Sequence, residues 1–266
     1  MIDIQNMRAY GFEGAIRGMR NPYNSWAKSD SVIEGNDILK LGEEDLKLCK
    51  KLVKAGSDHR KFMRMIHVQM DITAPLFMLK ELDTYKVGTT SNSCSTMHTV
   101  HKKPFENSDF SWEHMRKIES TDELFAYGEV TKGVLENLNR LRDLYIETKN
   151  MDYWYSLIEM LPSSYNQLRT YDFDYETLIR IYFARKAHKL AEWHTFCDTI
   201  KGMPYMSDFI KALEEPQAPR MPGLSMDQVV RLLDRIKEEA GDENPQDYID
   251  RVKERFLELN EGLLSV

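Results

Sequence analysis

Residues 65–79 read Met-Ile-His-Val-Gln-Met-Asp-Ile-Thr-Ala-Pro-Leu-Phe-Met-Leu, and this stretch decides the fold. From Ile66 to Ile72, apolar residues alternate with polar ones, and this period of two predicts a β-strand with one buried face. Pro75 then begins a short apolar segment, as proline often does in the first turn of a helix. The stretch therefore predicts a core strand that leads directly into a helix.

The rest of the chain up to residue 201 alternates between helical and strand patterns. Residues 168–173 alternate again and predict a second strand. Gly42 precedes an acidic first turn, and Gly56 stands where a left-handed residue ends a helix, so a helix is predicted between them. Further helices are predicted over residues 121–148, 152–160, 175–186 and 188–201. These elements indicate an α+β fold.

The C-terminal part is predicted to be separate from this α+β domain, which we assign to residues 1–213. Residues 214–223 contain three prolines and are predicted to form a linker. Beyond it, Ser225 to Gln228 has the form of a capping box. We therefore expect a C-terminal helical pair over residues 224–266.

The overall composition excludes some functions. A formal charge of −7 argues against a protein that binds a nucleic-acid polymer, since such proteins need a basic face. The apolar runs are too short to span a bilayer, and the N-terminus has no signal-peptide pattern. Three cysteines without framework spacing favour free thiols in a reducing compartment, so we expect a cytoplasmic protein without membrane partners.

A polar segment follows the predicted core strand and its helix. Between Thr84 and Thr96 it is rich in hydroxyl and amide side chains, and it contains Lys86 and Gly88 but no acidic residue. Backbone N–H groups, hydroxyls and one cation are suited to binding a phosphate. The alternative is an exposed loop that is polar only because loops are polar. Its direct connection to a core strand favours a binding role.

Arg185 is a second candidate because it shares a helix face with apolar residues. Leu178, Ile181, Tyr182 and Arg185 recur at helical spacing. A buried guanidinium needs an anionic partner. That partner is either a carboxylate of the protein, or a phosphate or carbonyl group of a ligand.

We expect no metal site. Cys94, His98 and His101 are possible ligands, but no second pair of ligand residues stands at comparable spacing, and structural zinc needs four ligands. Cys94 is also a possible nucleophile, although the sequence identifies no histidine as its base. We interpret it as a free thiol.

At this point the order of the motifs resembles the flavin-dependent thymidylate synthases over roughly residues 10–200. That family has a strand followed by Ala-Pro, an apolar and an aromatic residue, then Arg-Gln, then Arg-His-Arg-x-x-Ser, then Asn-Glu-x-Ser-x-Arg-Tyr. The corresponding segments here are residues 74–77, 80–81, 84–89 and 92–98, with one inserted residue before Asn92. Further on, Leu161-Pro162, Arg185 and residues 191–194 are similar to the family's Leu-Pro, its helical arginine and its Ala-Gln-Trp-Glu. Near the N-terminus, residues 15–17, Gly56, Phe62 and Arg64 also have counterparts.

The resemblance implies a central, mostly antiparallel sheet flanked by helices, and a homotetramer with sites shared between subunits. It implies binding of FAD and dUMP, with a reduced nicotinamide and methylene-tetrahydrofolate as co-substrates for methylation of the pyrimidine at C5. The residues expected to face the nucleotide are Lys80, Glu81, Ser93, Ser95 and Arg185. The residues expected to lie toward the flavin are Arg64, Thr84, Tyr85, Lys86 and Asn92.

The chain departs from the family's pattern at several cationic positions. Thr84 and Tyr85 replace an arginine and a histidine, Met97 replaces an arginine, and Arg64 stands where the family has a histidine. Each cation lost beside a phosphate or an enolate costs about 1.5–3 kcal/mol. Two hypotheses follow: a divergent enzyme that modifies a pyrimidine nucleotide, or a non-catalytic nucleotide-binding or interaction protein on the same scaffold.

Overall fold

The computed structural model describes residues 2–34, 37–121 and 129–215, and beyond them residues 234–235, 238–241, 244, 246–248 and 250–251. The chain divides into two compact units, residues 1–215 and residues 216–266. Most of the predicted linker and helical pair (residues 214–223 and 224–266) lies outside the described residues, so these assignments stay predictions. Glu214, the first residue of the predicted linker, is described, and it is the last residue of a helix.

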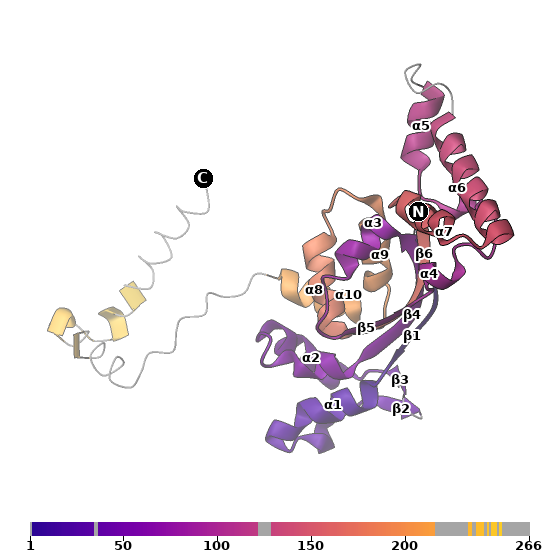
Figure 1. The fold of residues 1–266 in the computed structure, drawn as a ribbon. Helices are drawn as coiled ribbons and strands as arrows, with labels where there is room; N and C mark the ends of the chain where they lie inside the picture. The colour runs from indigo at the N-terminus through magenta and orange to yellow at the C-terminus, as the bar shows by residue number, and fades with distance from the viewer. Residues whose placement is uncertain are drawn as a thin grey trace. The chain divides into compact units, whose positions relative to one another are not determined.

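The first unit is built on a four-stranded sheet in the order β1-β4-β6-β5, and every pairing in it is antiparallel (Figure 1). The two predicted strands are confirmed as β4 (His67–Pro75) and β6 (Asn166–Asp174), which pair along their whole length. The alternation also has its predicted effect, because Val68, Met70 and Ile72 are buried whereas Gln69 is exposed. The expected α+β fold with an antiparallel sheet is therefore confirmed.

The outer strands of this sheet were not predicted. Strand β1 (Asp3–Tyr10) pairs with β4, and β5 (Thr89–Ser93) pairs with β6. The prediction of a loop between Thr84 and Thr96 is wrong for residues 89–93, which form an edge strand. Its Thr-Thr-Ser-Asn-Ser sequence carries no apolar alternation, because both of its faces are at least partly exposed. A separate hairpin joins β2 (Val32–Glu34) to β3 (Asp37–Lys40).

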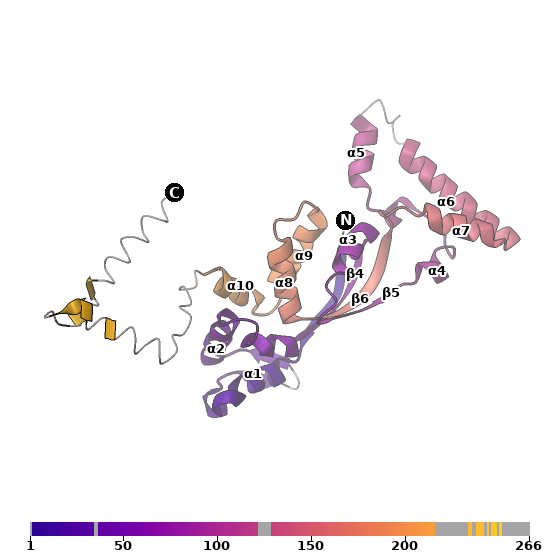
Figure 2. The ribbon, with the colours of Figure 1, turned by 60° about the vertical axis from the view of Figure 1, so that its left-hand side comes forward.

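Helices cover one face of the sheet, and Figure 2 shows α3, α8 and α9 on that side. The predicted helix after Pro75 is confirmed as α3 (Leu76–Leu82), and the helix before Gly56 as α2 (Glu43–Lys54). Gly56 has the expected positive φ, 107°. The other helices packed with this core are α1 (Phe12–Arg20), α8 (Tyr175–Arg185), α9 (Ala191–Lys201) and α10 (Met206–Glu214). Helix α9 begins three residues later than predicted.

A helical arm extends beyond the far end of β5 and β6 (Figure 2). It contains α5 (Glu113–Thr121), α6 (Glu129–Thr148) and α7 (Met151–Met160), with the short α4 (Thr96–Thr99) at its base. Of the helix predicted over residues 121–148, residues 129–148 are confirmed as α6 and Thr121 is the last described residue of α5, whereas residues 122–128 lie outside the described residues. The arm has its own apolar core, which includes Phe105, Phe110 and Leu138.

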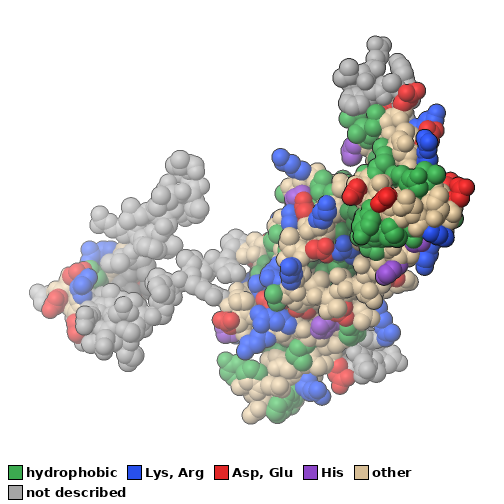
Figure 3. Space-filling view, in the orientation of Figure 1, with side chains coloured by type: hydrophobic (Ala, Val, Ile, Leu, Met, Phe, Trp, Pro, Cys, Tyr) green, Lys and Arg blue, Asp and Glu red, His purple; other side chains and the backbone are tan. Residues whose placement is uncertain are grey.

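Helix α7 also carries exposed apolar side chains. Met151, Tyr155 and Met160 are all exposed, and Figure 3 shows apolar side chains gathered in this region. No helix within the described residues is both long enough and apolar enough to cross a membrane.

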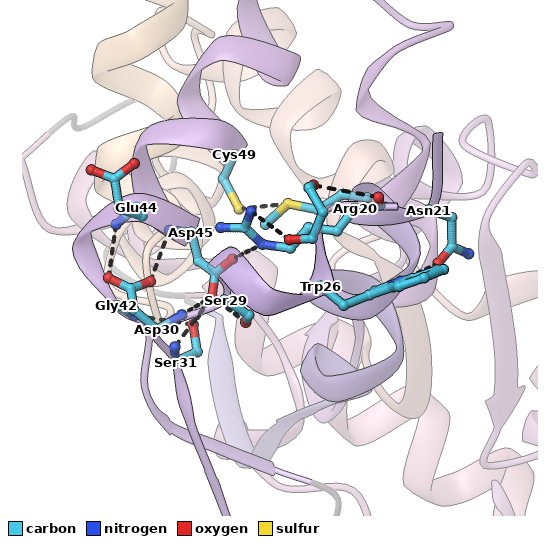
Figure 4. Close-up of polar contacts among 12 residues, drawn as sticks. Arg20, Asn21, Trp26, Ser29, Asp30, Ser31, Gly42, Glu44, Asp45 and Cys49 are labelled. Atoms are coloured by element: carbon cyan, nitrogen blue, oxygen red, sulfur yellow. Dashed lines mark hydrogen bonds and ion pairs between the residues drawn. The ribbon is translucent and has the colours of Figure 1, made fainter. Parts of the chain in front are cut away.

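A buried ion pair holds the N-terminal helices together (Figure 4). Arg20, the last residue of α1, donates from Nε to Asp45 in the first turn of α2 at 2.6 Å, and both side chains are buried. Asp45 also accepts hydrogen bonds from the hydroxyls of Ser29 and Ser31 at 2.7 and 2.6 Å. Burial alone would raise the pKa of Asp45, but these hydroxyls and Arg20 bring it below its ordinary value of 3.8.

We expect Asp45→Asn to lower the free energy of unfolding by about 3 kcal/mol, because it leaves the Arg20 charge buried without a counter-ion. Urea denaturation of the two proteins at neutral pH measures the change. Glu44→Gln is the matched control, since Glu44 is an exposed neighbour on the same helix. Equal stability of the Asp45→Asn variant and the wild type would contradict the assignment.

The lowered pKa of Asp45 also sets a pH dependence. A carboxylate whose pKa is lower in the folded state stabilises fully above its unfolded pKa, and it loses this effect as the pH falls through its folded pKa. The difference in unfolding free energy between wild type and Asp45→Asn should therefore stay constant from about pH 7 to about pH 5 and shrink below about pH 4. A difference that grows in acid would exclude this assignment.

Candidate functional site

The turn at Gly88, which lies in the polar segment just before β5, packs against the start of α8. Gly88 has a φ of 72°, and a Cβ there would lie 2.0 Å from Oδ2 of Asp174. Asp174 caps α8 by accepting from the backbone N–H of Thr177 at 2.6 Å. The hydroxyl of Thr177 in turn donates to the carbonyl of Val87 at 2.8 Å. The turn is therefore held against the helix that carries Arg185.

The pairing of β5 with β6 assigns the predicted site residues to faces of the sheet. Ser93 pairs with Arg169, and Asn92 pairs with Thr170. Because successive side chains in a strand point to opposite faces, Asn92 and Ser93 lie on opposite sides of the sheet. Ser93 shares the helix-covered face with the buried Tyr171, whereas Asn92 shares the open face with Thr170.

Three of the predicted residues meet above the covered face. Arg185 donates from Nε to the hydroxyl of Tyr85 at 2.9 Å, and its Nη1 lies 3.1 Å from Oε2 of Glu81. Trp193 Nε1 donates to the same oxygen at 2.9 Å, and His188 Nε2 lies 3.5 Å from it. We call these five residues the Glu81 cluster. Trp193 and His188 were not among the predicted site residues, although Trp193 stands in one of the motifs behind the resemblance.

Two anionic partners were predicted for Arg185, a carboxylate of the protein or a group of a ligand, and the structure contains the first of them. The guanidinium is stacked on Trp193 and Tyr85, with Cζ at 4.8 and 5.6 Å from the ring centroids, and its side chain is 20% exposed. Glu81 supplies the anion that a partly buried arginine needs. The internal carboxylate is therefore present, and the remaining exposure leaves the arginine accessible to a ligand.

Arg64 lies in a different place from the Glu81 cluster. It forms a hydrogen-bonded ion pair with Glu176 in the first turn of α8, and Arg60 binds the same carboxylate at 3.1 Å. Glu176 and Arg185 are nine residues apart on one helix, which corresponds to about 13 Å. Arg64 and the Glu81 cluster thus lie at opposite ends of α8.

The other predicted residues are mostly exposed. Lys80, Thr84 and Lys86 are exposed on α3 and in the loop that follows it. Thr84 donates to the carbonyl of Glu81 at 2.7 Å, so its hydroxyl supports the end of α3. Ser95 is half-buried and precedes α4 as its N-cap residue.

Sequence reasoning missed a polar network on the open face of the sheet. Asp172 accepts hydrogen bonds from Tyr10 and, at 3.1 Å, from Gln69, and its Oδ1 lies 2.7 Å from Nδ1 of His67. Burial and the neighbouring Asp172 raise the pKa of Tyr10 to about 12. The network borders a hollow of about 590 Å³ beside Gly11 and Met65. The alternation of β4 indicates that His67 faces outward, but its partners follow only from the strand register.

The cysteines and histidines considered for a metal do not form a cluster. No group of three His, Cys, Asp or Glu side chains suited to a metal ion occurs within the part of the chain that the structure describes. Cys94 is an exposed free thiol whose sulfur lies 3.6 Å from the hydroxyl of Thr99.

Comparison with solved structures relates this fold to known proteins. A thymidylate synthase ThyX from Helicobacter pylori, crystallised with FAD and dUMP, matches 81% of this chain and all of its own with a TM-score of 0.57 and 15% identity. The chain shares that fold. A second structure of a flavin-dependent thymidylate synthase ThyX from Helicobacter pylori, complexed with FAD and dUMP, matches 80% of this chain and 98% of its own with a TM-score of 0.55 and 15% identity. No family model and no curated protein matches the sequence.

Gly88 allows the turn before β5 to pack against Asp174 at the start of α8, so a substitution of this glycine tests the described turn. We expect Gly88→Ala to lower the free energy of unfolding by about 2 kcal/mol, because alanine is strained at a positive φ and its Cβ would overlap Asp174. Chemical denaturation measures this loss.

Gly133→Ala is the control for that variant. Gly133 lies within α6 with no atom within 4 Å of the added Cβ, so alanine should raise stability by about 0.5–1 kcal/mol. Gains of similar size for both variants would contradict the described turn.

Proposed function

We propose that this protein binds a pyrimidine deoxynucleotide of the dUMP type together with FAD, and that it modifies the pyrimidine at C5. The observation that carries the proposal is the Glu81 cluster. It combines a partly exposed arginine, a carboxylate and two aromatic rings at the end of a short helix, on a scaffold that ThyX proteins share. Converging polar groups beside aromatic walls are typical of small-molecule sites.

The charges near the start of α8 fit an anionic cofactor. Lys86 is exposed, and Arg180 donates to the carbonyl of Val87 at 3.5 Å, so the two cations flank the turn before β5. A hollow of about 550 Å³ nearby is lined by Arg60, Ile179, Arg180, Phe183, Ala184 and Leu213. Cations beside apolar walls suit a molecule that has a diphosphate and a flat ring system.

In this proposal Lys86 and Arg180 hold the cofactor's phosphates, and FAD supplies the redox chemistry that the side chains lack. Arg64 contributes less than its position in the sequence suggests, because Glu176 already binds it. A reduced nicotinamide, methylene-tetrahydrofolate, the homotetramer and the cytoplasmic location stay predictions that rest on the resemblance and the composition.

The same cluster also supports a non-catalytic alternative. Tyr85 stands where the family that the sequence resembles has a histidine, and its hydroxyl accepts a hydrogen bond from Arg185. A protein that binds a nucleotide through Arg185 without turning it over is the second candidate. The two functions differ in flavin uptake and in turnover, not in nucleotide affinity.

Binding of FAD and dUMP to the purified protein tests the proposal. We expect the protein to take up FAD with a flavin absorbance band, and dUMP to raise its melting temperature, because a ligand that binds only the folded state stabilises it. Arg185→Ala should weaken dUMP binding at least about tenfold through loss of a charged hydrogen bond. Titration calorimetry measures the affinities.

Arg140→Ala is the control, since Arg140 is an exposed arginine on α6. A colourless protein that ignores added FAD but binds dUMP would favour the non-catalytic alternative. A well-folded Arg185→Ala variant with unchanged dUMP affinity would remove the Glu81 cluster from either function.

A further inference from the structure

The two carboxylate oxygens of Glu81 have different surroundings. Oε2 receives Trp193 Nε1 at 2.9 Å and lies 3.1 Å from Arg185 Nη1 and 3.5 Å from His188 Nε2. Within the described residues, the hydrogen bond to this carboxylate goes to Oε2 and none goes to Oε1. The side chain is 34% exposed, so a ligand can reach it. One oxygen therefore anchors the side chain, and the other is available to a ligand.

The anchor fixes the direction in which Oε1 points. Arg185 is itself held by the Tyr85 hydroxyl at 2.9 Å and by stacking on Trp193. The rings of Tyr85 and Trp193 are in edge contact, with centroids 6.4 Å apart. Rotating the carboxylate would break the hydrogen bond from Trp193 and the close contacts with Arg185 and His188, so Glu81 presents Oε1 in a defined orientation.

A carboxylate that presents an oxygen selects ligands by hydrogen-bond polarity, because an ionised carboxylate only accepts. Cytosine carries a 4-amino group, which is the donor that Glu and Asp side chains accept from when they read this base. Uracil carries oxygen at that position. Its only ring donor, N3–H, lies between two carbonyl oxygens that a carboxylate repels.

The sequence sharpens this difference. At the position of Glu81, the family that the sequence resembles has a glutamine. A carboxamide both donates and accepts, so it can bind either base. The carboxylate of Glu81, held at Oε2 by Trp193, Arg185 and His188, accepts from the 4-amino group of cytosine but is repelled by the oxygen at the same position of uracil. We propose that Glu81 makes this site select a cytosine-type nucleotide, one with a 4-amino group, over a uracil nucleotide. The inference rests on the proposed nucleotide function and changes its substrate from uracil to cytosine.

Calorimetric titration of the full chain with dCMP and dUMP tests the selectivity. We expect the wild type to bind dCMP about tenfold more tightly than dUMP, which is within the discrimination of one well-placed base contact. Glu81→Gln should bring the ratio of the two affinities close to one. Both nucleotides carry the same phosphate, so any change in anion binding cancels in this ratio.

Glu147→Gln is the matched control, because Glu147 is an exposed glutamate on α6, and it should leave the ratio unchanged. A ligand-side measurement covers the case in which Glu81→Gln fails to fold. The wild type should bind N4-methyl-dCMP, which keeps one N–H donor, about tenfold more tightly than N4,N4-dimethyl-dCMP, which has none.

The outcomes separate the inference from the function on which it rests. A wild type that binds dUMP at least as tightly as dCMP overturns the selectivity and leaves the proposed function intact. An unchanged ratio in a folded Glu81→Gln variant, or equal binding of the two methylated analogues, shows that Glu81 does not select the base. A wild type that binds neither nucleotide overturns both the inference and the proposed function.

Discussion

The pairing of β4 with β6 is the constraint on which the candidate site depends. Each residue from His67 to Pro75 pairs with a residue between Asp174 and Asn166, so the helices that follow the two strands start at opposite ends of the sheet. Helix α3 is about 10 Å long and α8 about 16 Å, whereas the paired strands span about 30 Å. Because both helices run back over the same face, their C-terminal ends meet. Glu81 and Arg185, which are more than a hundred residues apart in sequence, thereby become neighbours.

The sequence predicted the elements whose residues have one buried and one exposed face. Strand β4 alternates strictly because the core covers its Val68, Met70 and Ile72, and β6 was predicted for the same reason. Strand β5 has no buried face to mark it, so its hydroxyls looked like a loop. Strand β1 was missed because all of its residues are exposed or only half-buried, so no apolar alternation marks it. Partners across strands, such as Asp172 for His67, depend on register, which no local pattern encodes.

The predicted site residues stay predictions, but the structure shows which of them lie together. The helical pattern gave Arg185 a place beside apolar residues, and it required an anionic partner, which the structure supplies as Glu81. That the partner is Glu81 depends on how α3 is placed, which the sequence does not contain. Arg64 was grouped with the loop residues, but Glu176 holds it at the other end of α8.

The polarity of β5 has a consequence for how the protein behaves at high concentration. The strand order puts β5 at the edge of the sheet, and an edge strand exposes backbone groups that can recruit a strand of another chain. Short edges without apolar side chains are poor templates for such aggregation. Five residues of threonine, serine and asparagine meet both conditions. The composition that concealed this strand in the sequence also protects the folded protein against edge-to-edge association.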